Sequence, residues 1–112
     1  MEQNDNKPGY ETVDATVFAD EIKNPETVLI DVRHPDEYAT GHIAGAENID
    51  VLNDDFINKV ESQLSKDKTV AVYCGLGKRS PVAAEKLSDA GYKVLNLAGG
   101  LQAWKQAGFS VE

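Results

Sequence analysis

The sequence predicts an α/β fold, and three observations lead to this prediction. The apolar runs 27–32, 69–73 and 94–97 are continuous rather than alternating, which is typical of parallel strands covered on both faces. Between the last two runs, apolar residues recur with helical spacing over 81–90. The resulting unit has the length of a strand–helix–strand crossover between parallel strands.

The amino-terminal half contains one clear strand and two weaker candidates. The run 27–32 is β-branched and apolar except at its end, so it predicts a buried strand. Shorter strands are expected at 11–13 and 46–49. A helix is expected over 14–22, because its first residue is an aspartate that can act as an N-cap and Pro25 follows its end.

The carboxyl-terminal half contains three helical patterns. Apolar residues at every fourth position predict an amphipathic helix over 56–64. The helix over 81–90 has well-marked ends, since Ser80 can act as its N-cap, Pro81 suits the first helical position and a glycine follows its last residue. A short closing helix is expected over 101–108.

Length and composition restrict the domain organisation and the class of protein. With 112 residues, we expect one domain over 10–112, preceded by a mobile N-terminus over 1–9. One cysteine, Cys74, excludes an intramolecular disulfide, and the two histidines cannot complete a Cys₄ or Cys₂His₂ zinc site.

The charge and the hydropathy pattern restrict partners and location. The formal net charge of -8 disfavours nucleic acid and anionic membrane surfaces as partners. No apolar run is long enough to span a membrane, and the first ten residues lack a signal-peptide pattern. We therefore expect a cytoplasmic protein without a membrane partner, and a monomer because no exposed apolar stripe is evident.

The chemistry indicated by the sequence centres on Cys74. This residue directly follows a predicted buried strand, where open parallel sheets place their ligand crevice. Two glycines in the next three residues allow successive amides to form an anion-binding nest, and the following helix adds its N-terminus. These groups and two cations should lower the thiol pKa from about 8.5. We therefore predict a nucleophilic Cys74 within a binding loop of Gly75, Leu76, Gly77, Lys78, Arg79 and Ser80.

Cys74 also admits a purely structural role, and two cysteine chemistries compete for a loop of this kind. A lone cysteine is more commonly a small buried hydrophobe at the end of a strand. Cysteine-dependent phosphatases have five residues between the cysteine and an arginine, whereas Arg79 comes one place earlier here. The shorter loop should suit a single sulfur atom on Cys74 better than a phosphoryl group, so the loop length favours sulfur transfer.

The chain resembles the rhodaneses, a family of sulfurtransferases, over nearly its whole length. Three separated motifs carry the resemblance. The first covers 29–33, 37–38 and 41–49. The second is formed by Cys74, Gly77 and Arg79 of the loop, and the third by 99–101 with Trp104. The resemblance implies a rhodanese-like α/β fold, with about five parallel strands in a sheet flanked by helices on both faces. One departure is Gly75, where many thiosulfate-using members carry a cation.

The resemblance also implies a two-step, ping-pong sulfur transfer through a Cys74 persulfide. The donor would be thiosulfate or a persulfide, the acceptor would be cyanide or a thiol, and the covalent mechanism needs neither metal nor cofactor. Two alternatives stay open: a persulfide carrier that works with a sulfur-relay protein, and a non-catalytic rhodanese-like interaction domain. A phosphatase or an arsenate reductase is less favoured.

The histidines and the charged residues near the loop are expected to have structural or donor-attracting roles, not catalytic ones. A thiolate stabilised by amides needs no general base, so neither His34 nor His42 is expected to be catalytic. Arg33 and Glu37 are expected to form an ion pair that holds their loop. The two loop cations, Lys78 and Arg79, are expected to attract an anionic donor.

Overall fold

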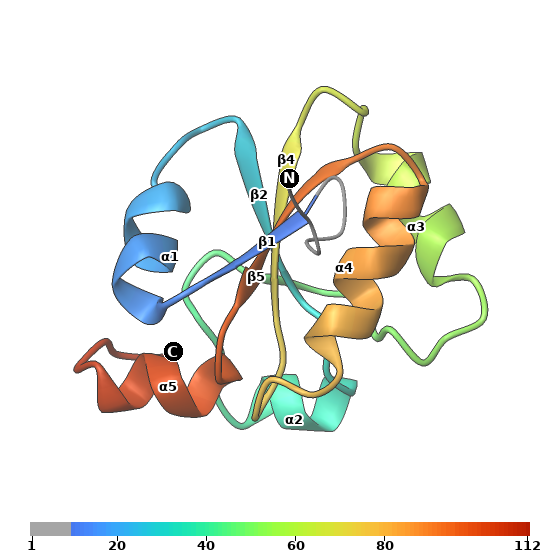
Figure 1. The fold of residues 1–112 in the computed structure, drawn as a ribbon. Coiled ribbons are helices and arrows are strands. Elements are labelled where there is room, and N and C mark those ends of the chain that lie inside the picture. The colour runs from blue at the N-terminus through green and yellow to red at the C-terminus, as the bar shows by residue number, and fades with distance from the viewer. Residues whose placement is uncertain (1–9) are drawn as a thin grey trace.

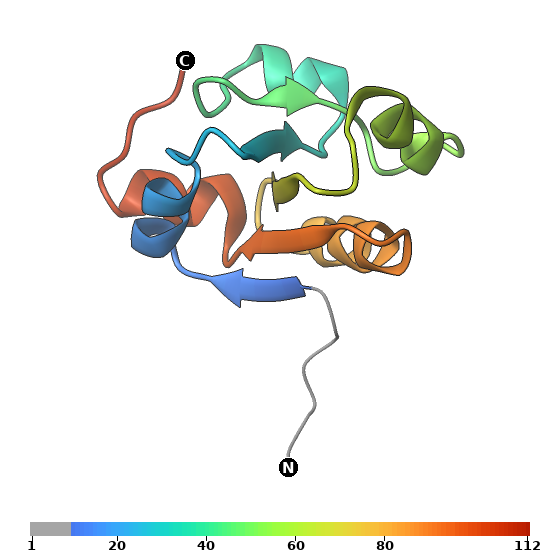
Figure 2. The same ribbon diagram turned by 90° about the horizontal axis from the view of Figure 1, so that it is seen from above.

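The computed structural model describes residues 10–112, and its centre is a five-stranded parallel sheet in the order β1-β5-β4-β2-β3 (Figures 1 and 2). The predicted fold class is confirmed. The prediction of a mobile terminus over 1–9 falls outside the described residues. The strands are β1 (Tyr10–Val13), β2 (Thr27–Asp31), β3 (Glu47–Asn48), β4 (Thr69–Tyr73) and β5 (Lys93–Leu97).

Helices cover both faces of this sheet. In Figure 1, α3 and α4 lie on one side, α1 and α5 lie on the other, and α2 lies beyond the carboxyl ends of the strands. Four of the five helices in the described residues 10–112 begin and end within two residues of the predicted bounds, whereas α2 was not predicted. The helices are α1 (Ala15–Glu21), α2 (Pro35–Ala39), α3 (Phe56–Gln63), α4 (Ser80–Asp89) and α5 (Gly100–Gln106).

The central strand β4 shows why the apolar runs are continuous. Val70 and Val72 belong to the core cluster beneath α3 and α4, whereas Ala71 and Tyr73 belong to the cluster beneath α1 and α5. Each of these four side chains is fully buried. Because both faces of the strand are covered, alternation between apolar and polar residues is lost.

The register brings three loops together at one edge of the sheet. Asp31 of β2 pairs with Tyr73 of β4, and Val72 of β4 pairs with Asn96 of β5. The loops that follow β2, β4 and β5 therefore leave the sheet side by side. Among residues 10–112, no helix combines the length and hydropathy that crossing a bilayer requires.

Candidate active site

Cys74 lies one residue beyond β4, between the loops that follow the two neighbouring strands. Its side chain is 1% exposed and forms part of the core beneath α4. Its carbonyl accepts a hydrogen bond from the Leu101 amide at 2.8 Å, and the Gly75 carbonyl accepts one from the Gln102 amide at 3.1 Å. The start of the Cys74 loop is thus fastened to the first turn of α5.

The Cys74 sulfur is surrounded by hydrogen-bond donors from its own loop. The amides of Gly77 and Ser80 donate to Sγ at 3.1 and 3.3 Å. The Ser80 hydroxyl lies 3.5 Å from Sγ. A thiol donates to this hydroxyl, and a thiolate accepts from it. Ser80, the predicted N-cap, is the first residue of α4, and Arg79 occupies the N-cap position. The Ser80 amide donates its hydrogen bond to Cys74 Sγ.

The pKa of Cys74 reflects a balance between burial and these hydrogen bonds. Burial raises the pKa, but the Ser80 hydroxyl and the amides of Ser80, Arg79 and Gly77 lower it, and the net pKa lies below the ordinary thiol value. These hydrogen bonds contribute more than the cationic side chains of the loop, to which the sequence had assigned part of the effect. Lowering the pKa increases the thiolate fraction, which is the nucleophilic form.

Two glycines allow the Cys74 loop and the start of α5 to lie back to back. Gly77 has φ +92°, and a Cβ there would lie 3.0 Å from the Gly99 nitrogen. Gly100 has φ +62°, and a Cβ there would lie 2.5 Å from the Cys74 carbonyl oxygen. Since any larger residue would displace backbone atoms, the curvature of the Cys74 loop depends on glycine at both positions.

The ion pairs around the loop differ from the predicted arrangement. Arg33 does not pair with Glu37; its guanidinium binds the buried Asp31 carboxylate at 2.7 Å and the Gly41 carbonyl at 2.7 Å. Glu37 instead binds Arg79 through two hydrogen bonds of 2.8 and 3.0 Å. The Arg33–Glu37 prediction was therefore wrong, because α2 turns Glu37 away from β2 and toward the Cys74 loop.

Glu37 positions the Cys74 loop through Arg79, whereas the sequence interpretation gave it a loop-holding role through Arg33. Its hydrogen bonds to Arg79 and to the His34 amide lower its pKa to about 2, against a smaller opposing effect of burial. A recognisable signal was present, because a proline at the first helical position followed two residues later by glutamate marks a helix start at Pro35. With its charge balanced by Glu37, Arg79 is less available to a donor than predicted.

The remaining loop side chains face solvent. Leu76 is 62% exposed, and Lys78 is exposed without an ion-pair partner among the described residues. A cleft of about 350 Å³ lies beside Gly75 and Leu76 and is closed on its other side by α5. Lys78 and this cleft are therefore the features through which the loop can meet a ligand.

Neither histidine is placed as a base for Cys74 within residues 10–112. The His34 imidazole binds Asp50 at 2.6 Å. The His42 ring stacks on Tyr38 and lies 3.0 Å from the Tyr38 carbonyl oxygen. Both side chains have partners of their own, in agreement with the structural roles expected of them.

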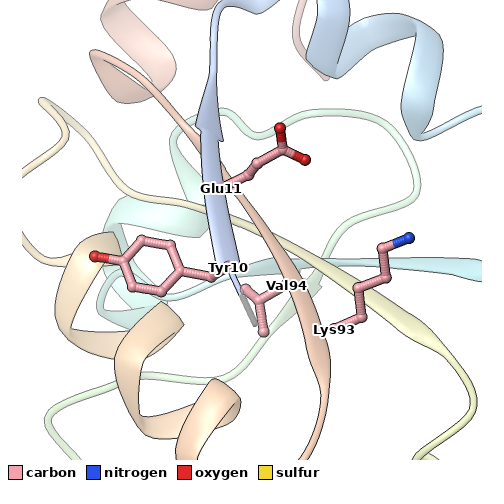
Figure 3. A pocket seen from close by; sticks show the side chains of 4 residues that line it. All are labelled: Tyr10, Glu11, Lys93 and Val94. Carbon is pink, nitrogen blue, oxygen red and sulfur yellow. The ribbon is translucent and has the colours of Figure 1, made fainter. Parts of the chain in front are cut away.

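A second hollow, of about 240 Å³, lies at the opposite end of the sheet. It is lined by Tyr10, Glu11, Lys93 and Val94 at the amino ends of β1 and β5 (Figure 3). It contains no cysteine, so it does not offer the thiol chemistry predicted for Cys74. Among the described residues, no group of three or more His, Cys, Asp or Glu side chains is arranged to hold a metal ion.

Comparisons with known proteins agree with the fold. The sequence model of one family, described as "Rhodanese-like domain", matches residues 14–107. A protein of Allochromatium vinosum named "Sulfurtransferase" is 35% identical, with 88% of this chain and 92% of that protein covered. The Escherichia coli protein "Thiosulfate sulfurtransferase PspE" is 38% identical over 65% of this chain and 69% of its own length.

Solved structures show the same architecture. The rhodanese-like domain of an Anabaena sp. protein superposes with a TM-score of 0.80 at 32% identity, covering 90% of this chain and 77% of that chain. The chain spans about half the length of several other curated relatives, between 44% and 59% of each.

Proposed function

This chain belongs to the family of rhodanese-like domains, and from that premise we propose that it is a sulfurtransferase that carries sulfur as a persulfide on Cys74. The observation that carries the proposal is the convergence of the Gly77 and Ser80 amides on Sγ. Relatives named as sulfurtransferases support the general activity. The donor, the acceptor and the roles of the loop residues are our proposal.

In the first step, the Cys74 thiolate attacks the outer sulfur of the donor. With thiosulfate, the bond between Sγ and that sulfur forms as the sulfur–sulfur bond of thiosulfate breaks, and the electron pair leaves with sulfite. The product is a Cys74 persulfide anion, so no oxidant is consumed. A persulfide donor reacts in the same way and releases its own thiolate.

In the second step, a thiophile attacks the outer sulfur of the Cys74 persulfide. Cyanide leaves as thiocyanate, or a thiolate leaves as a new persulfide, and the electron pair of the broken bond returns to Sγ. The loop amides, with the Ser80 hydroxyl, stabilise the negative charge in both half-reactions. The negative charge moves from Sγ to the outer sulfur in the first half-reaction and returns to Sγ in the second, so the loop donors have to stabilise an anion at two positions one sulfur–sulfur bond apart.

A persulfide carrier for a relay protein is the second candidate function. The chain has glycine at position 75, and Arg79 is paired with Glu37, so Lys78 is the loop cation left to attract a small dianion such as thiosulfate. Weak turnover with thiosulfate that a protein donor restores would favour the carrier. A non-catalytic interaction domain would need neither Cys74 nor its amide ring.

Intact-mass spectrometry tests the proposal directly. Incubation with thiosulfate should add the mass of one sulfur atom to the protein, at Cys74, and cyanide should remove it. Cys74→Ser should not gain this mass and should lose all transfer activity, while its circular dichroism stays that of the wild type. No gain with thiosulfate or with a low-molecular-weight persulfide, or activity retained in Cys74→Ser, would contradict the proposal.

The cytoplasmic location and the monomeric state expected from the sequence stay predictions. They are compatible with the proposed chemistry, because the reaction uses small diffusible sulfur compounds and residues of one chain. Neither metal nor cofactor enters either half-reaction as written.

A further inference from the structure

The cleft beside the Cys74 loop has the size and the lining of a small-molecule site. Its volume of about 350 Å³ falls at the lower end of the range of about 300–1,000 Å³ that is common for ligand pockets. Gly75 and Leu76 line one side, and Leu101, Gln102 and Lys105 line the other. A thiosulfate ion would fill only a small part of this space, so the cleft is suited to a larger molecule.

The charges that line the cleft are not equivalent. The Arg33 guanidinium is already bound to the Asp31 carboxylate and to the Gly41 carbonyl. Lys105 is exposed and has no ion-pair or hydrogen-bond partner for its side chain among the described residues. The cleft therefore offers one uncommitted cation, together with the side-chain amides of Gln102 and Gln106.

Gly75 leaves the loop side of the cleft without a competing side chain. A Cβ at this position would lie 3.5 Å from Arg79 Nη2 and 3.9 Å from Arg33 Cδ, which are ordinary contact distances. A larger residue would thus be accommodated, and its side chain would occupy space beside the cleft wall. Glycine keeps that space open and leaves Lys105 as the uncommitted cation in the lining of this cleft.

The helix that carries Lys105 is fixed relative to the sulfur. The amides of Leu101 and Gln102 bind the carbonyls of Cys74 and Gly75. Lys105 lies one turn after Leu101, which is about 6 Å along the helix axis. A molecule that presents a sulfur atom to Cys74 can therefore extend along α5 and place an anionic group near Lys105.

From these observations we propose that the cleft binds the acceptor of the sulfur, and that this acceptor is a low-molecular-weight organic thiol with a carboxylate that pairs with Lys105. The inference rests on the proposed sulfur transfer. Leu76 and Leu101 contact the carbon chain of the thiol, and the glutamine amides suit a peptide-like backbone. The acceptor thiolate attacks the outer persulfide sulfur, the bond to Sγ breaks, its electron pair stays on Cys74, and the acceptor leaves as a persulfide.

The rate of persulfide discharge tests this selectivity. The persulfidated protein is mixed with N-acetylcysteine or with its uncharged amide, for the wild type, Lys105→Gln and Lys59→Gln. Lys59 is an exposed lysine on α3, across the sheet from α5, so its variant makes the same change in net charge. Comparing each thiol between proteins cancels the difference in intrinsic thiol reactivity.

We expect slower discharge for only one combination of protein and thiol, Lys105→Gln with N-acetylcysteine. Lys105→Gln should slow discharge by N-acetylcysteine about threefold, as for a solvent-exposed ion pair, and leave discharge by the amide and by cyanide unchanged. Lys59→Gln should match the wild type. Equal slowing of both thiols, or equal effects of the two lysine variants, would overturn the inference.

A binding experiment separates this inference from the proposed activity. N-acetyl-S-methylcysteine is a thioether that cannot take part in sulfur transfer, and its titration is followed by NMR in the wild type and in Lys105→Gln. Chemical-shift changes at 101–106 that weaken in Lys105→Gln support the cleft assignment, even if no persulfide forms on Cys74. Absence of shifts, or shifts that the uncharged amide of the thioether reproduces equally, would overturn it, even if sulfur transfer is established.

Discussion

At the scale of single residues, burial and hydrogen bonding act on the Cys74 thiol in opposite directions. Burial in the core beneath α4 disfavours the anion, while the Ser80 hydroxyl and three amides of the loop favour it and prevail. In the proposed sulfur transfer, a buried Cys74 thiol would therefore need no general base. Its protonation state depends on backbone amides, which do not titrate, and on one hydroxyl.

Ser80→Ala should raise the pKa of Cys74, because the variant removes the hydroxyl and leaves burial unchanged. The rate of carboxamidomethylation by iodoacetamide near neutral pH should fall by about tenfold, since a hydrogen bond to an ionised group is worth about 1.5–3 kcal/mol and about 1.4 kcal/mol is a factor of ten. The midpoint of its pH profile should move upward. Ser62→Ala is the control, because Ser62 is an exposed residue of α3 whose hydroxyl donates to the Lys59 carbonyl. An unchanged midpoint in Ser80→Ala would count against this account.

Glu37→Gln should weaken the hold of α2 on Arg79 in a pH-dependent way. The pKa of Glu37 is lowered to about 2, from an ordinary value of 4.5. Its ion pair therefore stabilises the fold fully above about pH 4.5, and this contribution is lost as the pH falls toward 2. Because the Glu37 and Arg79 side chains are 36% and 30% exposed, screening limits the contribution to about 1 kcal/mol.

Urea unfolding of the wild type and Glu37→Gln at several pH values measures this contribution. The difference in free energy of unfolding should be largest near neutral pH and should shrink steadily below pH 4.5. A difference that stays constant over this range would show that the carboxylate charge is not what matters.

At the scale of elements, the candidate site is the meeting point of two backbone segments rather than a cluster of side chains. The Cys74 loop and the start of α5 approach so closely that glycines separate them, and the loop carbonyls accept hydrogen bonds from α5 amides. The curvature that directs the loop amides at Sγ is therefore supported from behind by α5. Glu37 of α2 lies 42 residues before Arg79 in the chain and binds its guanidinium, so α2 supports the loop from another side.

Gly100→Ala should damage both stability and thiol reactivity. The new Cβ would lie 2.5 Å from the Cys74 carbonyl oxygen and 2.7 Å from that of Gly75, and backbone atoms cannot rotate away. We expect a loss of about 2–3 kcal/mol in free energy of unfolding, and slower alkylation of Cys74 in the folded protein.

Gly108→Ala provides the matched control for this substitution. Gly108 also has a positive φ, of +93°, but no atom lies within 4 Å of its would-be Cβ. The control should lose about 1–2 kcal/mol through backbone strain alone and keep its alkylation rate. Equal alkylation rates in the two variants would contradict the support of the loop by α5.

At the scale of the whole molecule, the fold buries one sheet between two helical layers while the chain carries a formal net charge of -8. Most buried side chains are apolar, and the buried charges of Asp31 and Arg33 compensate each other. The excess negative charge is therefore on the surface, where it opposes compaction by self-repulsion.

Added salt should consequently stabilise the protein. Raising the sodium chloride concentration from about 20 to 200 mM shortens the Debye length from about 20 Å to about 7 Å and screens this repulsion. We expect the Tm to rise by a few degrees in differential scanning calorimetry, despite weaker surface ion pairs such as Lys66–Glu61. A Tm that falls with salt would show that the surface ion pairs outweigh the repulsion.

The sequence by itself determined the strands, every described helix except α2, and the position of the Cys74 loop. The local hydrophobic pattern predicts the strand at 69–73 and the helix that follows it, and signals such as Pro81 mark where the helix begins. The amides that approach Cys74 Sγ come from residues three and six positions away. A loop this short with two glycines has few ways to turn, so its cradle could be anticipated.

Only the tertiary structure decided how the segments around that loop meet. Arg79 pairs with Glu37, Arg33 pairs with Asp31, and α5 forms the far side of the cleft with Lys105. Periodicity identifies the buried face of a helix but not the distance between two charged side chains on different elements. Those distances follow from strand order and register, which join residues far apart in the chain and are set only when the whole sheet assembles.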